Sequence, residues 1–187
     1  GGFSFGDKLG SGKALAARLR YGKAFDEVRG LSRDGVHWLG ICNGFQVLTQ
    51  CGLLPNLSGS FEHEASLVVN RSGRFEDRWV RCRGAGVLSG ESFELPVRHG
   101  EGRLVYRDDA TRDSARALVV LSYLDVEGRP TEAYPANPNG SPEGAAGLQS
   151  PDGRALGMMP HPEAFLFPEA HPAWASRKLS MPASQHA

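Results

Sequence analysis

The chain has 187 residues, enough to bury a hydrophobic core without disulfides or metals and typical of one domain. Hydrophobic residues make up 40% and charged residues 22%, as in an ordinary globular protein. The 21 basic and 21 acidic side chains cancel, so the composition gives no reason to expect a nucleic-acid partner or an anionic membrane surface.

The cellular compartment is inferred from the cysteines and from the absence of targeting signals. Cys42, Cys51 and Cys82 are few and odd in number, and they form neither a CxxC pair nor a metal-ligand spacing with the histidines. No apolar run approaches the roughly 20 residues that span a bilayer, and the first ten residues do not resemble a signal peptide. The sequence therefore predicts a cytoplasmic protein with no disulfide framework, no metal and no membrane contact.

The first third of the chain alternates glycine-rich turns with helical patterns. Residues 1–12 form a glycine-rich loop whose "GSGK" suggests a phosphate loop. That motif requires glycine where Asp7 stands and serine or threonine where Ala14 stands, so we reject it. Residues 13–30 predict one helix, rich in alanine, leucine and arginine.

A short apolar run at 36–41 is typical of a buried parallel strand. A helix is expected at 43–51, and Gly52 stands where a C-terminal cap would lie. Further strands are expected at 67–69, 79–80, 95–99, 103–106, 117–123 and 155–159, a loop at 134–144, and a proline-punctuated tail after Phe167 that wraps the surface. This order indicates an α/β sheet with an added antiparallel portion.

Cys42 lies in the motif G-x-C-x-G, between the predicted strand and the predicted helix. The serine form of this motif is the nucleophile elbow of hydrolases, in which small flanking residues permit a sharp, strained turn. A cysteine at a helix N-terminus has a stabilised thiolate, and the backbone N–H of Asn43 is placed to bind an oxyanion. An isolated motif of this kind is equally compatible with a buried structural cysteine.

A cysteine nucleophile requires a base, and the base requires a group that orients it. The best candidate is His161 in "MPHPE", because prolines on both sides keep the segment extended and place Glu163 on the same face. Taken alone, this tripeptide is more typical of a solvated loop, and only together with the motif around Cys42 does it indicate a catalytic base. The other histidines that could supply the imidazole are His37, His63, His99, His171 and His186.

Several motifs together resemble a known family. They are "GGFSFGD", "GICNGFQVLTQCGLLPN", "RHGEGR", "YPANPNGSPEGAAG" and "GMMPHPE". They closely resemble the class I glutamine amidotransferase of phosphoribosylformylglycinamidine synthase, along nearly the whole chain. The resemblance implies a flavodoxin-like, three-layer α/β fold with a mostly parallel central sheet and an added antiparallel portion.

The resemblance also implies a catalytic triad of Cys42, His161 and Glu163. Cys42 would attack the side-chain amide of glutamine, and His161 would protonate the departing ammonia and then activate water against the thioester. The oxyanion hole would consist of the backbone N–H groups of Gly2 and Asn43.

Two further positions match the family's glutamine site. Gln46 lies one turn into the helix after the nucleophile, and His99 lies in the "RHGEGR" loop, so both are expected to bind substrate. No cofactor is expected on this chain. The resemblance implies that ATP and magnesium bind to a synthetase subunit or domain, which receives the ammonia, with a small accessory subunit as a further possible partner.

The chain departs from the family pattern at two places. Family members begin with a strand, a helix and a second strand before the "GG" that opens this chain, so residues 1–187 are expected to be a single, N-terminally incomplete amidotransferase domain. Ala164 replaces an arginine that many members carry after "PHPE".

Two motifs suggest contact with the synthetase. We hypothesise that Asn139, in "NPNGSP", and Glu101 belong to a docking surface, although the loop could be only a rigid turn and "RHGEGR" only a charged hairpin. Two alternatives to a glutaminase remain open. One is a cysteine hydrolase on the same fold, and the other is a non-catalytic docking module.

Overall fold

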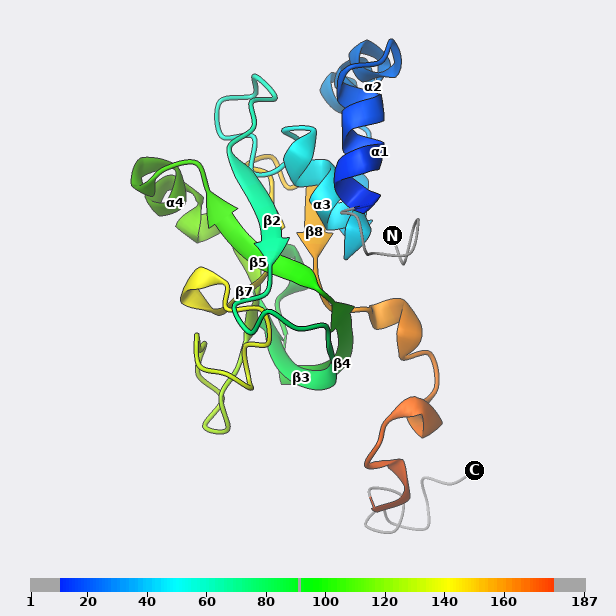
Figure 1. Ribbon diagram of the computed structural model, residues 1–187, viewed down its shortest axis with the longest axis vertical. Coiled ribbons are helices and arrows are strands. Elements are labelled where there is room, and N and C mark those ends of the chain that lie inside the picture. The colour runs from blue at the N-terminus through cyan, green and yellow to red at the C-terminus, as the bar shows by residue number, and fades with distance from the viewer. Residues whose placement is uncertain (1–10, 91, 177–187) are drawn as a thin grey trace.

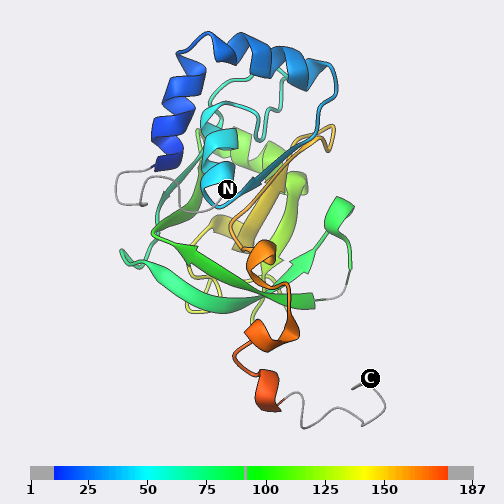
Figure 2. The same ribbon diagram turned by 90° about the vertical axis from the view of Figure 1, so that its right-hand side faces the viewer.

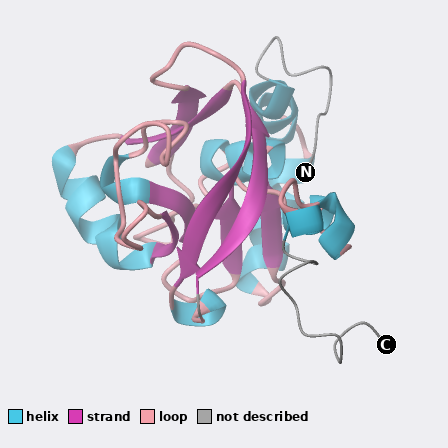
Figure 3. Ribbon diagram, turned by 90° about the horizontal axis from the view of Figure 1, so that it is seen from below, coloured by secondary structure: helices cyan, strands magenta, loops and turns pink. Residues whose placement is uncertain are grey.

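The strands form two sheets in the computed structural model, which describes residues 11–90 and 92–176 (Figure 1). The larger sheet contains, in spatial order, β1 (Trp38–Ile41), β8 (Ala155–Met158), β7 (Ala145–Gln149), β6 (Val119–Tyr123), β3 (Glu76–Gly84) and β4 (Ser92–His99). The smaller sheet pairs β2 (Ala65–Val69) with β5 (Glu101–Tyr106) in antiparallel register. Seen from below, the strands run through the middle of the molecule with helices to either side (Figure 3).

The α/β class is confirmed, but the expectation of a mostly parallel sheet needs correction. Among the described strands only β1 and β8 run parallel, and every other neighbouring pair is antiparallel. Parallel neighbours require a long crossover connection, whereas short turns produce antiparallel hairpins. The short turns from β3 to β4 and from β7 to β8 therefore give antiparallel pairs.

The prediction of a single helix at 13–30 is wrong, because two helices occupy this region. They are α1 (Ser11–Arg20) and α2 (Ala24–Arg33), separated by a turn at Gly22. A Cβ atom at Gly22 would lie 2.5 Å from the carbonyl oxygen of Arg18, so the turn closes tightly on the end of α1. In Figures 1 and 2 the two helices stand at one end of the molecule, together with α3 (Asn43–Gln50).

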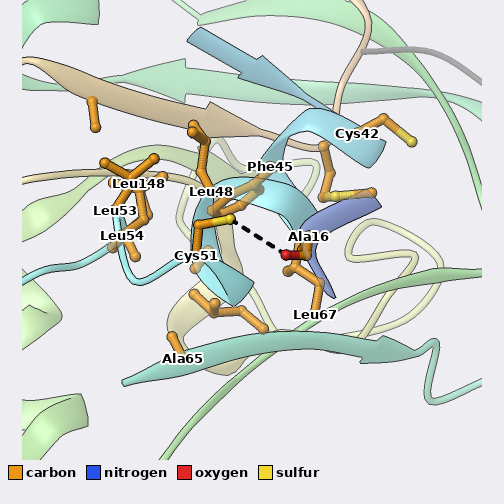
Figure 4. Packing of buried hydrophobic residues seen from close by; sticks show 14 of the residues in the cluster. Ala16, Cys42, Phe45, Leu48, Cys51, Leu53, Leu54, Ala65, Leu67 and Leu148 are labelled. Carbon is orange, nitrogen blue, oxygen red and sulfur yellow. Dashed lines mark hydrogen bonds between the residues drawn. The ribbon is translucent and has the colours of Figure 1, made fainter. Parts of the chain in front are cut away.

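The helix expected after Cys42 is confirmed as α3. It ends at Gln50, with Cys51 as its C-cap, and the following Gly52 adopts a φ of +71° and packs against Phe61 so closely that a Cβ atom would lie 2.2 Å from that residue's carbonyl oxygen. Phe45 and Leu48, which are 1% and 5% exposed, anchor α3 in the core beside β1 and β8 (Figure 4). Burial of a side chain of this size contributes about 1.5–3 kcal/mol, so the helix that follows Cys42 is firmly held.

Two regular elements had not been expected. Helix α4 (Asp109–Ala115) begins at Asp108, whose carboxylate accepts a hydrogen bond of 2.7 Å from the Thr111 N–H as an N-cap. Strand β7 occupies the apolar run "AAGLQ", between two Ser-Pro turns. Short 3-10 turns complete the described structure: η2 (Gly86–Leu88), η3 (Arg116–Leu118), η4 (Pro142–Gly144), η5 (Pro162–Ala164) and η6 (Pro168–Ala170).

The segment after β8 contacts the sheet through its first part. The rings of Phe165 and His171 lie 4.8 and 4.5 Å from that of Trp79 on β3, centroid to centroid. Figures 1 and 2 show the orange chain beyond η5 leading away from the sheets, although the His171 Nε2 still lies 3.2 Å from the Glu94 carboxylate on β4. None of the described helices is both long and apolar enough to cross a membrane.

The motif "RHGEGR" is not a hairpin. Arg98 lies on β4 and Arg103 on β5, and these strands belong to different sheets. The chain therefore crosses from the larger sheet to the smaller one at Gly100. This crossing places the backbone of the motif against α3, because the Gln46 Nε2 donates a hydrogen bond of 2.9 Å to the carbonyl oxygen of Glu101.

The "NPNGSP" loop is a buried structural element and not an exposed docking surface. Asn139 is 0% exposed, its Nδ2 donates to the Tyr123 hydroxyl at 3.0 Å, and its Oδ1 accepts from the Ser141 N–H at 2.9 Å. The Ser141 hydroxyl in turn accepts from the Leu104 N–H at 2.9 Å, which ties the loop to β5. The docking hypothesis is therefore wrong for Asn139.

Replacing Asn139 by alanine is expected to lower the free energy of unfolding by about 2–4 kcal/mol, because it leaves two buried polar groups without partners. Urea unfolding followed by circular dichroism measures this change. The matched control is Asn56→Ala, a turn residue whose Oδ1 accepts from the Phe61 N–H at 3.0 Å in a partly buried position. A smaller loss for Asn139→Ala than for the control would contradict the structural role.

Candidate active site

Cys42 occupies a strained turn between β1 and α3. Its backbone adopts φ 54° and ψ −105°, a conformation that residues other than glycine rarely adopt. The Cys42 N–H donates to the carbonyl oxygen of Met158 at 2.8 Å, which continues the pairing of β1 with β8 and holds the turn. The predicted elbow geometry is confirmed. Figure 4 shows Cys42 at one end of α3 and Cys51 at the other.

His161 leaves the sheet at the same end as Cys42. Ile41 pairs with Met158 in parallel register, so Cys42 and His161 both follow the carboxyl ends of neighbouring parallel strands. In open α/β sheets, that edge is where ligand sites form. Both residues also contact one stretch of β4. The Cys42 Sγ donates to the Arg98 carbonyl at 3.7 Å, and the His161 N–H donates to the Pro96 carbonyl at 2.8 Å.

Glu163 contacts the imidazole as expected, but the segment is not extended as predicted, because Pro162–Ala164 form the 3-10 turn η5, in which the Ala164 N–H donates to the His161 carbonyl at 3.1 Å. The His161 Nδ1 lies 2.6 Å from the Glu163 Oε1. An ionised carboxylate only accepts hydrogen bonds, so Nδ1 carries the proton and Nε2 is the basic nitrogen. The His161 side chain is 5% exposed and that of Glu163 49%, so the carboxylate lies at the rim of the site.

The first turn of α3 holds two further candidates. Asn43 begins the helix, so its N–H lies at the helix N-terminus, where the helix dipole favours negative charge. Gln46 is 2% exposed, and its Oε1 has no hydrogen-bond partner among the described residues. A Cβ atom at Gly12 would lie 2.4 Å from this oxygen, so α1 packs directly over Gln46. Gly2, the other oxyanion candidate, lies outside the described residues.

His99 is fully buried at the end of β4. Its Nδ1 lies 3.0 Å from the Asn70 Oδ1, which also accepts the Gly102 N–H at 3.0 Å. The amide nitrogen of Asn70 donates to the carbonyls of Arg74 and His99, so Oδ1 is the acceptor and His99 carries its proton on Nδ1. The Nε2 has no partner among the described residues. Burial, and then the charge of nearby His161, lower the pKa of His99 to about 4, so the ring is neutral.

Asn70, the hydrogen-bond partner of His99, is a residue of the site that could not be identified from the sequence. It follows β2 and lies far from His99 in the chain, and only the pairing of β2 with β5 brings the two together. An asparagine after a strand is ordinarily a turn residue, so no local signal distinguished it.

The remaining cysteines, Cys51 and Cys82, are 1% and 0% exposed, which supports the expectation that they are structural. Burial raises the pKa of the Cys82 thiol to about 12, and it also raises the pKa of the Cys51 thiol against the opposing effect of Arg20. Neither thiol is therefore prepared for nucleophilic attack.

The other histidines do not approach Cys42. The His63 ring contacts the Ser66 hydroxyl at 2.8 Å, the His171 Nε2 lies 3.2 Å from Glu94, and His37 is exposed. His186 lies outside the described residues. Within residues 11–90 and 92–176, no group of histidine, cysteine and carboxylate side chains could hold a metal ion.

Comparison with known proteins gives a consistent assignment. The family model described as a CobB/CobQ-like glutamine amidotransferase domain matches residues 1–186. The chain is 37% identical over 187 residues to the phosphoribosylformylglycinamidine synthase subunit PurQ of Methanococcus maripaludis, covering 95% of this chain and 68% of that protein. It is 40% identical over 178 residues to the phosphoribosylformylglycinamidine synthase of Drosophila melanogaster, covering 87% of this chain and only 13% of that protein.

A solved structure supports the fold. The structure of PurLQS from Thermotoga maritima contains a chain that matches with a TM-score of 0.65 and 31% sequence identity, covering 91% of this chain and 69% of that one. The mixed sheet with flanking helices is therefore shared with one chain of a structure that its description names PurLQS.

Proposed function

The chain belongs to the CobB/CobQ-like glutamine amidotransferase family, and on that basis we propose that it hydrolyses glutamine to glutamate and ammonia for phosphoribosylformylglycinamidine synthesis. The observation that carries the proposal is the contact of His161 with Glu163 at the same sheet edge as the strained Cys42 turn. An elbow cysteine, a base and an orienting carboxylate are the parts that nucleophilic hydrolysis of an amide requires.

In the first half of the reaction, the basic Nε2 of His161 takes the proton of the Cys42 thiol, and the resulting thiolate attacks the side-chain carbonyl carbon of glutamine. A carbon–sulfur bond forms, and the carbonyl oxygen becomes an oxyanion. The protonated Nε2 of His161 then gives its proton to the amide nitrogen, the carbon–nitrogen bond breaks, and ammonia leaves a glutamyl thioester. Glu163 stabilises the imidazolium through its hydrogen bond to Nδ1.

In the second half, the Nε2 of His161 takes a proton from water as the water oxygen attacks the thioester. The carbon–sulfur bond breaks, glutamate leaves, and the thiolate of Cys42 is restored. The N–H of Asn43, at the start of α3, stabilises the oxyanion in both halves, assisted by the N–H of Gly2.

Gln46 and His99 hold the glutamine substrate in this proposal. Both are almost completely buried, and each has one acceptor atom without a partner among the described residues, the Gln46 Oε1 and the His99 Nε2. Such atoms favour a ligand that donates hydrogen bonds. The amide and ammonium groups of glutamine are donors of this kind.

The ammonia is proposed to pass to a synthetase subunit, since relatives of this chain carry the description of a synthase subunit and one is part of an assembly named PurLQS. ATP and magnesium would be bound by the synthetase and not by this chain, and a small accessory subunit would be a further partner. Such an assembly would operate in the cytoplasm.

Glutamine turnover by the purified chain, alone and with the synthetase, tests the proposal. Release of glutamate and ammonia from glutamine is expected, without cleavage of peptides. Peptide cleavage would favour a cysteine hydrolase on the same fold. Binding to the synthetase without glutamine hydrolysis under either condition would favour a docking module.

Replacing Glu163 by glutamine is expected to lower kcat about a hundredfold or more, with little change in KM, because the carboxylate stabilises charge that develops on His161 only during the reaction. Steady-state glutaminase kinetics measure this effect. Glu169→Gln is the matched control, since Glu169 is an exposed carboxylate in the same segment. Equal kcat values for the two variants would remove Glu163 from the triad.

A further inference from the structure

The side chain of Asn70 joins the ends of β2 and β4 to the start of β5. It is 3% exposed, and its Nδ2 donates to the carbonyl oxygens of His99 at 2.8 Å and Arg74 at 2.9 Å. Its Oδ1 accepts the Gly102 N–H at 3.0 Å. These three backbone contacts fix the amide in one orientation. The remaining contact, from Oδ1 to the His99 Nδ1 at 3.0 Å, is to a side chain.

Gly102 provides the surface against which the His99 ring lies. A Cβ atom at Gly102 would be 2.8 Å from the Nδ1, 2.9 Å from the Cε1 and 3.1 Å from the Cγ of that ring. Carbon atoms in a packed interior do not approach this closely, so the contact requires glycine. The N–H of the same glycine binds the Asn70 Oδ1, and one backbone segment therefore fixes both the ring and its hydrogen-bond partner.

His99 borders the candidate active site through its backbone and its ring. The Cys42 Sγ donates at 3.7 Å to the carbonyl of Arg98, which belongs to the peptide group joining Arg98 to His99. After burial, the charge of His161 is the next cause that lowers the pKa of His99, so the two imidazoles are close in space. A change in the orientation or the protonation of His99 would therefore act inside the site.

The two imidazoles of the site have chemically different partners. The Nδ1 of His161 contacts the Glu163 carboxylate, which favours a positively charged ring, whereas the Nδ1 of His99 contacts the neutral amide of Asn70. His161 is thereby suited to exchange a proton, and His99 is suited to keep one proton on Nδ1. The carboxylate opposite His99 on β3 is engaged by other side chains: Glu76 contacts Ser72 and Arg78.

We propose that Asn70 is a positioning residue for the glutaminase, because it holds His99 in the tautomer whose Nε2 accepts a hydrogen bond from glutamine. The inference rests on the proposed function, from which the ligand is taken. An imidazole that carries its proton on Nδ1 offers only an acceptor at Nε2, and the other tautomer offers a donor there. With the other tautomer, a donor of His99 would meet an N–H of glutamine in a buried site, which weakens binding.

Asn137 is a matched control for the structural part of the Asn70 contacts. It is 1% exposed, and its Nδ2 donates to the carbonyls of Thr131 at 3.1 Å and Ser141 at 2.9 Å. Its Oδ1 accepts the Gly140 N–H at 2.8 Å. Asn137 thus repeats the bonds of Asn70 to two carbonyls and one N–H, without a contact to a histidine among the described residues. Asn137→Ala reports what the loss of such a buried amide does to the fold alone.

The tautomer of His99 is measured directly by ¹⁵N NMR of the full chain with labelled histidine, and His99→Ala assigns the signals. In the unmodified chain we expect a protonated Nδ1 and an unprotonated Nε2. Asn70→Ala should move proton occupancy toward Nε2, whereas Asn137→Ala should leave the signals unchanged. Circular dichroism checks that each variant is folded. A proton on the His99 Nε2 of the unmodified chain would overturn the proposal, whether or not any variant folds.

Glutamine binding is measured by isothermal titration calorimetry in the Cys42→Ser chain, in which turnover does not consume the ligand. Adding Asn70→Ala is expected to raise the Kd for glutamine about tenfold, and adding Asn137→Ala should change it less than about twofold. In a chain that also carries His99→Ala, Asn70→Ala should change the Kd less than about twofold, because Asn70 acts through His99. Equal Kd values for the Asn70 and Asn137 variants, or an undiminished effect of Asn70→Ala without His99, would overturn the proposal.

Turnover of glutamine, measured in parallel, separates this inference from the proposed function. In the otherwise unmodified chain, Asn70→Ala is expected to raise KM about tenfold and to change kcat only a few-fold, since the triad is intact. Glutamine binding without turnover by the unmodified chain would overturn the proposed hydrolysis alone. Absence of glutamine binding by the Cys42→Ser chain would overturn the role assigned to Asn70.

Discussion

Replacing Cys42 by serine is expected to lower kcat/KM for glutamine hydrolysis at least about 10³-fold, because the serine hydroxyl is far less nucleophilic than a thiolate. The strained turn and the helix that follows it stay in place, since the substitution changes a single atom. The variant is therefore expected to remain folded. Release of glutamate in a coupled assay measures the loss, and intact-mass spectrometry after exposure to a glutamine-like electrophile reports the modified residue.

The other buried cysteines are the controls for this experiment. Cys51→Ala and Cys82→Ala remove thiols that burial keeps protonated, so both variants should retain activity and adduct formation. Free glutamine should suppress the adduct on Cys42. An adduct on Cys51 or Cys82 instead, or activity in Cys42→Ser close to that of the unmodified chain, would show that the nucleophile has been misassigned.

The parts of the site that are local in sequence could be predicted from it. The turn at Cys42 requires small residues on both sides, and the contact between His161 and Glu163 joins residues two positions apart, although the 3-10 turn η5 and not an extended chain brings them together. Both are consequences of backbone geometry within a few residues. For that reason they needed no knowledge of how the strands pair.

The parts that depend on strand pairing could not be predicted. His99 and Asn70 meet only because β2 pairs with β5, and the "RHGEGR" motif contacts Gln46 only because the chain changes sheets at Gly100. The mostly parallel sheet was expected from the resemblance to the amidotransferase family. In the structure, short connections join β3 to β4 and β7 to β8. Strands joined by a short connection pair in antiparallel orientation.

Burial also changed the interpretation of a motif. The "NPNGSP" loop has the composition of an exposed turn, and its polar side chains suggested a docking surface. In the structure those side chains bond to one another, to Tyr123 and to β5, so they shape the loop from within. Residues 137–141 are buried, and the exposed Arg71 covers Gly140, so polar composition alone did not distinguish a buried loop from an exposed one.

The position of the nucleophile depends on one contact between backbones. Gly40 lies on β1 just before Cys42, and a Cβ atom there would be 2.6 Å from both the carbonyl carbon and oxygen of Gly44. It would also lie 2.7 Å from the Leu48 Cδ1. Carbon atoms do not approach this closely, and a helix backbone cannot turn aside as a flexible side chain can. The first turn of α3 must therefore move if Gly40 gains a side chain.

Replacing Gly40 by alanine is consequently expected to lower the free energy of unfolding by about 2–4 kcal/mol and to reduce glutaminase activity more than about a hundredfold in the fraction that folds. Urea unfolding and activity per folded molecule measure the two effects. Gly30→Ala, inside α2 with no atom within 4 Å of the added Cβ, is the matched control and should raise stability by about 0.5–1 kcal/mol. Full activity in Gly40→Ala would mean that the close contact of β1 with α3 does not position Cys42.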